Sequence, residues 1–90
     1  MNMKEMEENY KKSIQIMDEG ADLANAGDLA NALVKFKESC QLSPQNIKAF
    51  INTAQCLVYM DRHAEAKTYI VEAQTLIETA SKISIGIRER

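Results

Sequence analysis

The chain has 90 residues, a net charge of −2 at neutral pH and a hydrophobic fraction of 46%, which suits one small globular domain. This charge balance, with only three tyrosines and two phenylalanines, argues against a nucleic-acid partner. The apolar runs are too short to span a membrane, and residues 1–12 are too polar for a signal peptide. We therefore expect a cytoplasmic protein that binds neither nucleic acid nor membrane.

Metal and redox chemistry are also disfavoured by the residue inventory. Cys40 and Cys56 are the two cysteines and His63 is the single histidine, which is too few for a metal site of ordinary spacing. Both cysteines fall among apolar positions, where a free thiol usually behaves as a small buried hydrophobic group. The sequence predicts no metal and no cofactor.

The first half of the chain predicts two helices joined by a tight turn. Apolar or small residues recur every three or four positions over residues 3–26, which only a helix places on one face. Gly27 is suited to the position just past a helix end, and Asp28 can accept the amide hydrogens that begin the next helix. A second helix is expected over residues 29–42, and Pro44 favours its end and the start of another.

The second half predicts a similar pair. A third helix is expected over residues 47–60, followed by a turn at residues 61–63 that lacks a glycine. A fourth helix should begin near His63 and continue to residue 80, with no proline to stop it. Residues 83–87 alternate apolar and small side chains, and we expect a helix extension or a flexible contact segment over residues 81–90.

The two halves repeat at a constant spacing of about 34 residues, and small residues pair with small ones and large apolar residues with large ones. The matching pairs include Gly20 with Ala54, Leu23 with Leu57, Ala32 with Ala66, and Phe36 with Ile70. A repeat of this length is one helical unit that cannot bury its own apolar face, so units stack and function comes from the resulting surface.

These residues resemble the tetratricopeptide repeat family, with one unit at residues 13–46 and a second at 47–80, preceded by a helix extension at 1–12. The resemblance implies an all-α fold of antiparallel helix pairs stacked as a short right-handed α-solenoid. Departures from the family pattern are Ile16 for an aromatic residue, Asp61 for the turn glycine, and Glu78 for the closing proline. A plain four-helix bundle with helices of equal length is the alternative.

In this family the first helix of each unit lines a concave groove that holds a helix or an extended peptide of a partner protein. By resemblance, the groove residues here are Ile14, Met17, Asp18, Ala21, Ala24, Asn25, Lys48, Ile51, Asn52, Gln55, Val58 and Tyr59. Some of them could instead fill space beside the helix extension. Met17 and Ala21 stand where the carboxylate-binding version of the fold needs a basic residue and an asparagine, so that version is disfavoured.

The ends of the array predict a second kind of contact. Methionine packs adaptably against other helices, and repeat arrays with few units leave apolar end faces. The candidate end contacts are Met3, Met6 and Tyr10 near the N-terminus, with Tyr69, Ile77 and Ile83 on the last helix. They indicate a homodimer or docking into a larger helical assembly, unless the ends fold back over the units.

Catalysis needs a positioned nucleophile or base with a partner group, and the sequence offers no such set. His63 lies in an expected turn between two acidic residues, as a surface residue would. We expect a non-catalytic interaction module that acts as an adaptor, an assembly factor or a small chaperone. The alternative is a structural protein that self-assembles through its helix ends.

Overall fold

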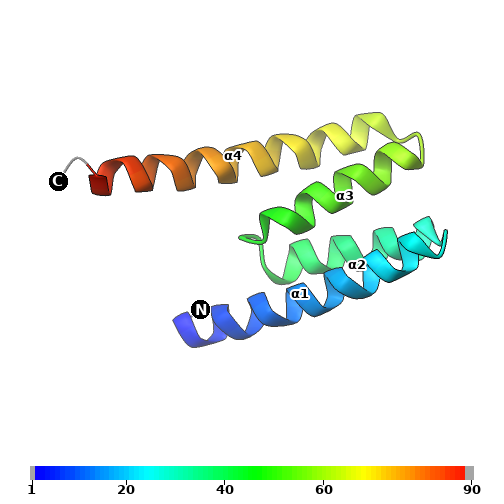
Figure 1. The fold of residues 1–90 in the computed structure, drawn as a ribbon, viewed down its shortest axis with the longest axis horizontal. Helices are drawn as coiled ribbons and strands as arrows, with labels where there is room; N and C mark the ends of the chain where they lie inside the picture. Colours follow the sequence, from blue (N-terminus) through cyan, green and yellow to red (C-terminus); the bar gives the residue numbers. More distant parts are fainter. Residues whose placement is uncertain (1, 89–90) are drawn as a thin grey trace.

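Four α-helices make up the computed structural model, which describes the backbone of residues 2–88 and the side chains of residues 2–82. Figure 1 shows the helices in chain order. Their bounds are α1 at Met3–Asn25, α2 at Leu29–Leu42, α3 at Ile47–Tyr59 and α4 at His63–Arg88. No strand occurs in this described part, so the prediction of an all-helical fold is confirmed.

The helix bounds differ little from those expected. The first three helices each begin next to a residue whose side chain caps the helix, which fixes where they start. The side chains of Asn2, Asp28 and Asn46 each accept a hydrogen bond from a backbone amide in the first turn that follows. α1 and α3 each end one residue earlier than expected. α4 continues as helix through the tail to Arg88, past the point where a strand-like alternation begins.

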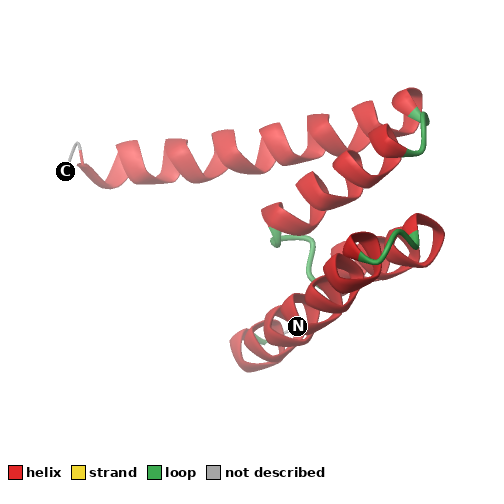
Figure 2. Cartoon of the chain, turned by 45° about the vertical axis from the view of Figure 1, so that its right-hand side comes forward, coloured by secondary structure: helices red, strands yellow, loops and turns green. Residues whose placement is uncertain are grey.

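The helices form two antiparallel pairs, α1 with α2 and α3 with α4, and α3 packs against both helices of the first pair. Figure 2 shows the two pairs inclined to one another, with α4 projecting well beyond α3. A closed four-helix bundle would pack α1 against α4, and these helices do not meet over the described residues. The molecule is accordingly elongated, with extents of 48 × 29 × 19 Å.

Gly20 lies in close contact with Phe36 and Lys35 of α2. A Cβ atom built on Gly20 would lie 2.7 Å from Cε1 of Phe36 and 3.2 Å from Cβ of Lys35. These separations are shorter than van der Waals contact, so a larger residue would force Phe36 aside or push the helices apart. In the second pair, Ala54 takes the place of Gly20 and Ile70 the place of Phe36.

A buried polar cluster joins α1, α2 and the start of α3. Ser39 Oγ donates to the carbonyl oxygen of Ser13 at 2.7 Å, and Ser13 Oγ lies 3.0 Å from the carbonyl oxygen of Ser39. Asn46 Nδ2 donates to Ser13 Oγ at 2.8 Å, while Asn46 Oδ1 accepts from the Ala49 amide. All three polar side chains are buried, so the cluster fixes where α3 begins.

The two turns within the pairs have the same hydrogen bonds. The Asp28 amide donates to the Leu23 carbonyl, and at the equivalent place in the second unit the Arg62 amide donates to the Leu57 carbonyl. The residue before each donor is left-handed, with φ of 87° at Gly27 and 62° at Asp61. The missing glycine therefore does not change the turn, because aspartate tolerates this conformation better than most residues with a Cβ.

Gly20→Ala should lower the free energy of unfolding by about 1 kcal/mol, because the clash with Phe36 outweighs the gain in helix propensity. The double variant Gly20→Ala/Phe36→Ile reproduces the pair found in the second unit and should recover part of that loss. Urea denaturation followed by circular dichroism measures both effects. A stabilised Gly20→Ala protein would show that α1 and α2 are not in such close contact.

Asp61→Gly should raise the free energy of unfolding by roughly 0.5–1 kcal/mol, because glycine adopts positive φ without steric strain. The substitution also removes the contact of Asp61 with His63, but both side chains are exposed and such pairs contribute little. The equivalent reverse change, Gly27→Asp, should lower stability by a similar amount. The same denaturation measurement tests both, and a loss of stability in Asp61→Gly would contradict the equivalence of the turns.

Candidate functional site

A concave hollow of about 650 Å³ lies between α1, the start of α2, and α3. Its lining residues are Ala21, Ala24, Asn25, Gly27, Leu29, Phe36, Asn52, Gln55, Cys56 and Tyr59. Residues on α1 and α3 face one another across it because α3 packs against both α1 and α2. We call this hollow the concave groove.

The chemistry of the concave groove is that of a neutral binding surface. Alanine and leucine provide apolar area, while Asn25, Asn52 and Gln55 provide amide donors and acceptors. Tyr59 is largely exposed and adds an aromatic ring with a hydroxyl group. No lining side chain is charged at neutral pH, and burial raises the pKa of the Cys56 thiol. The lining suits an apolar or amphipathic segment with a few hydrogen bonds.

The residues expected in the groove fall into three groups. Ala21, Ala24, Asn25, Asn52, Gln55 and Tyr59 do line it, whereas Ile14, Asp18 and Lys48 do not. Met17 belongs to the buried core and is not accessible to a ligand. Ile51 and Val58 are exposed but lie outside the lining of the groove.

Gly27, Leu29, Phe36 and Cys56 line the groove without having been expected there. They come from the first turn, from α2, and from the side of α3 that packs against α2. The Cys56 thiol donates to the Leu29 carbonyl oxygen at 3.4 Å, which holds this part of α3 over the start of α2. The sequence pattern marks such residues as core, and only the packing of α3 shows that they also form the groove floor.

A second hollow of about 510 Å³ lies near the N-terminus. It is lined by Met3, Met6, Glu7, Tyr10 and Lys11 from α1, and by Gln45 before α3. Met3, Met6 and Tyr10 are exposed, so three of the expected end contacts lie together on one side of α1. Apolar side chains grouped in this way are suited to contact with another helix.

The end contacts expected on α4 are in different environments. Tyr69 is partly buried against Phe50, with ring centroids 6.1 Å apart, and burial raises the pKa of its hydroxyl group. Ile77 is about half exposed. The side chain of Ile83 lies outside the described residues.

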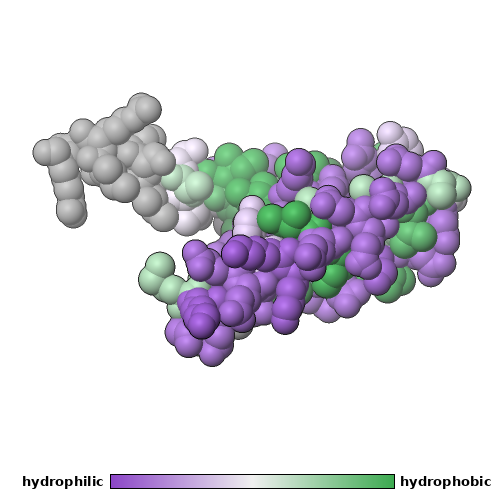
Figure 3. All heavy atoms as spheres, turned by 60° about the horizontal axis from the view of Figure 1, so that its bottom comes forward, coloured by the Kyte–Doolittle hydropathy of each residue, from purple (hydrophilic) through white to green (hydrophobic). Residues whose placement is uncertain are grey.

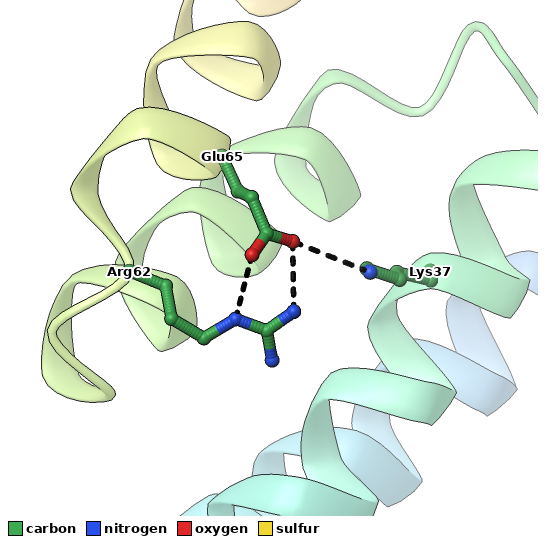
Figure 4. Close-up of polar contacts among 3 residues, drawn as sticks. All are labelled: Lys37, Arg62 and Glu65. Carbon is green, nitrogen blue, oxygen red and sulfur yellow. Dashed lines mark hydrogen bonds and ion pairs between the residues drawn. The ribbon is translucent and has the colours of Figure 1, made fainter.

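Charged groups join the start of α4 to α2. Arg62 donates from Nε and Nη2 to the two carboxylate oxygens of Glu65, each at 2.8 Å, and Lys37 Nζ lies 4.0 Å from Glu65 Oε2 (Figure 4). The Arg62 hydrogen bonds, followed by the charges of Arg62 and Lys37, hold the pKa of Glu65 below its usual value. The cluster is at the surface and orients the second turn rather than forming a reactive site.

Among the described residues, the remaining nucleophilic and ligating groups do not gather at one place. Cys40 and Cys56 are free thiols, and burial raises the pKa of each, which disfavours the reactive thiolate. Within the part of the chain that the structure describes, no three His, Cys, Asp or Glu side chains are placed to hold a metal ion. Likewise, no helix in that part has a stretch long and apolar enough to cross a membrane.

Two proteins of known sequence are similar to this chain. An uncharacterized protein of Methanocaldococcus jannaschii, MJ0572, is 34% identical over 62 residues, which cover 69% of this chain and 72% of that protein. The photosystem I assembly protein Ycf3 of Acaryochloris marina is 31% identical over 75 residues. That match covers 83% of this chain but only 45% of Ycf3, so the chain spans less than half of its length.

No profile of a known protein family matches the sequence, and no solved structure matches it. The archaeal match, at 34% identity, covers more than two thirds of each of the two chains. This chain therefore belongs to the same protein family as MJ0572 of Methanocaldococcus jannaschii.

Proposed function

We propose that this protein is a non-catalytic interaction module of two tetratricopeptide units, which binds a helix or an extended peptide of a partner protein in its concave groove. The proposed role is that of an adaptor, an assembly factor or a small chaperone in the cytoplasm. The observation that carries the proposal is the concave groove itself, where the first helices of the two units present amide and apolar groups to one hollow.

The equivalence of the two units supports the tetratricopeptide assignment. The close contact at Gly20 recurs as a small residue at Ala54, and the left-handed turn residue at Gly27 recurs at Asp61. Small residues at the helix crossing let the two helices of each pair approach one another. These features favour stacked units over a bundle of unrelated helices.

The similarity to Ycf3 supports a role in assembly. That protein is described as an assembly protein, and its similarity to this chain extends over both units. Assembly factors act by holding other proteins, which suits a groove without catalytic groups. The name of Ycf3 does not imply that this chain acts on a photosystem.

A second candidate function is homo-oligomerisation through the helix ends. The hollow beside Met3, Met6 and Tyr10 favours it, because an exposed apolar side of α1 can pack against the same side of a second copy. Met6→Glu should dissociate such an oligomer without affecting the concave groove. Sedimentation equilibrium over a wide concentration range separates this function from peptide binding.

Peptides selected from a random library on the purified full chain test the groove. Asn52→Ala and Tyr59→Ala should each weaken the selected peptides by about tenfold, because each removes a side chain that lines the hollow. Fluorescence anisotropy measures the dissociation constants. The matched control is Val34→Ala on α2, whose exposed side chain lies outside the groove and should leave affinity unchanged.

The proposal fails if the selected peptides bind with unchanged affinity to both groove variants. It also fails if the library yields no saturable binder while the protein is folded by circular dichroism. An acidic C-terminal peptide that binds tightly and is lost in Asn52→Ala would instead identify a carboxylate-binding groove.

A further inference from the structure

The second unit leaves open a surface that the first unit buries. α3 packs on the first helix pair, so residues of α1 and α2 at that contact are covered. The equivalent residues of the second unit lie on α3 and α4, where no further helix packs on them within the described part. We call this surface the end face, defined by Ile51, Lys67, Ile70, Gln74 and Ile77.

Exposed fractions measure the difference between the units. Met17 is 6% exposed and its equivalent Ile51 is 47% exposed, while Phe36 is 4% exposed and Ile70 is 44% exposed. Ser43 is 5% exposed, but Ile77 is 47% exposed. Three isoleucines thus stand in water at positions where the first unit has buried side chains, which is costly unless another element covers them.

The chain does not cover the end face by the route it uses in the first unit. There, α2 ends at Leu42 and the chain turns through Asn46 into α3. At the equivalent point after Leu76, α4 continues as helix to Arg88. The residues that follow Leu76 therefore extend α4 and do not form a helix that covers the end face.

A second copy stacked head to tail does not suit the end face. Its α1 would take the position of α3, and the α3 residues that pack on the first unit, Ala49, Thr53 and Cys56, are all buried. In α1 the equivalent residues are Gln15, Glu19 and Asp22, which are not buried, and Glu19 pairs with Lys35 at 3.5 Å. Burying these two carboxylates against isoleucine would be strongly unfavourable.

The surface on the α1 side has the polarity expected of a cap. Figure 3 views the molecule from that side and shows mostly hydrophilic side chains, with smaller groups of hydrophobic ones between them. Repeat arrays use such polar outer faces to end a stack. The first unit is thus polar at Gln15, Glu19 and Asp22, whereas the end face of the second unit exposes three isoleucines.

We infer that the end face binds one amphipathic helix of a different protein, in the position on the second unit that α3 takes on the first. In this interface the partner helix packs on α4 as α3 packs on α2. This site is separate from the concave groove, so one partner segment could occupy each.

The end face also specifies the chemistry of the partner helix. Ile51, Ile70 and Ile77 require an apolar stripe with small residues, like that of α3. Gln74 replaces Cys40, which lies 3.4 Å from Thr53 Oγ1, so the partner should offer a hydrogen-bonding side chain there. Lys67 replaces the buried Leu33, so a carboxylate should stand opposite its ammonium group.

The test uses the α3 segment itself as the probe, titrated with the full chain. The probe is a fluorescein-labelled peptide of residues 45–60. It carries Cys56→Glu, which supplies the carboxylate for Lys67. It also carries Asn52→Asp, whose side chain is joined to that of Lys48 by a lactam. The lactam keeps so short a helix folded, since unrestrained peptides of this length are marginal. Fluorescence anisotropy follows binding.

Saturable binding is expected, with at least a roughly tenfold loss of affinity in Ile70→Asp and in Ile77→Asp. Tyr59→Ala, a groove variant, should bind the probe as the wild type does. The probe with Cys56→Lys should bind the wild type roughly threefold more weakly, and the Lys67→Glu protein should reverse that preference. Circular dichroism confirms that each variant is folded.

Absence of saturation up to about 1 mM probe would overturn the inference. Wild-type affinity in both isoleucine variants would also overturn the inference, because the probe would then bind elsewhere on the protein. A dimer in sedimentation equilibrium that Ile70→Asp converts to a monomer would show that a second copy, and not a partner helix, covers the end face.

Discussion

Close contact between α1 and α2 is the constraint on which the rest of the structure depends. It depends on small residues at the contact, where Gly20 leaves room for the Phe36 ring and Ser13 is hydrogen-bonded to Ser39. The serine pair satisfies its hydroxyl groups within the contact, which a dry interior requires of buried polar groups. Asn46 then joins the pair and at the same time caps α3, so the packing of the first unit determines where the second begins.

Stacking of the second helix pair on the first forms the concave groove and the end face. Because α3 starts from a fixed point on the first pair, its side chains meet those of α1 at the concave groove and those of α2 in the core. The same stacking that builds the groove leaves the isoleucines of the end face uncovered, since no α3-like helix follows in the described part. Both proposed binding surfaces are consequences of stacking two units.

Helix positions were predictable from the sequence because apolar spacing, Gly27 and Pro44 each have a local cause. The left-handed turn at Asp61 was predictable in principle, since Asp61 is the repeat equivalent of Gly27, but the missing glycine obscured it. The serine and asparagine cluster was not, because its hydrogen bonds join residues far apart in sequence. Met17, Ile51 and Val58 have the helical spacing of groove residues, and only stacking separates buried, end-face and groove positions.

A double-mutant cycle between Ser13 and Asn46 tests most directly whether the first unit positions the second. Ser13→Ala, Asn46→Ala and the double variant would be unfolded in urea, with Gln41→Ala as a control at an exposed position of α2. The account predicts a coupling free energy of about 1–2 kcal/mol, since either substitution removes the buried hydrogen bond from Asn46 Nδ2 to Ser13 Oγ. Additive effects within about 0.3 kcal/mol would contradict it, because the two units would then be joined without this cluster.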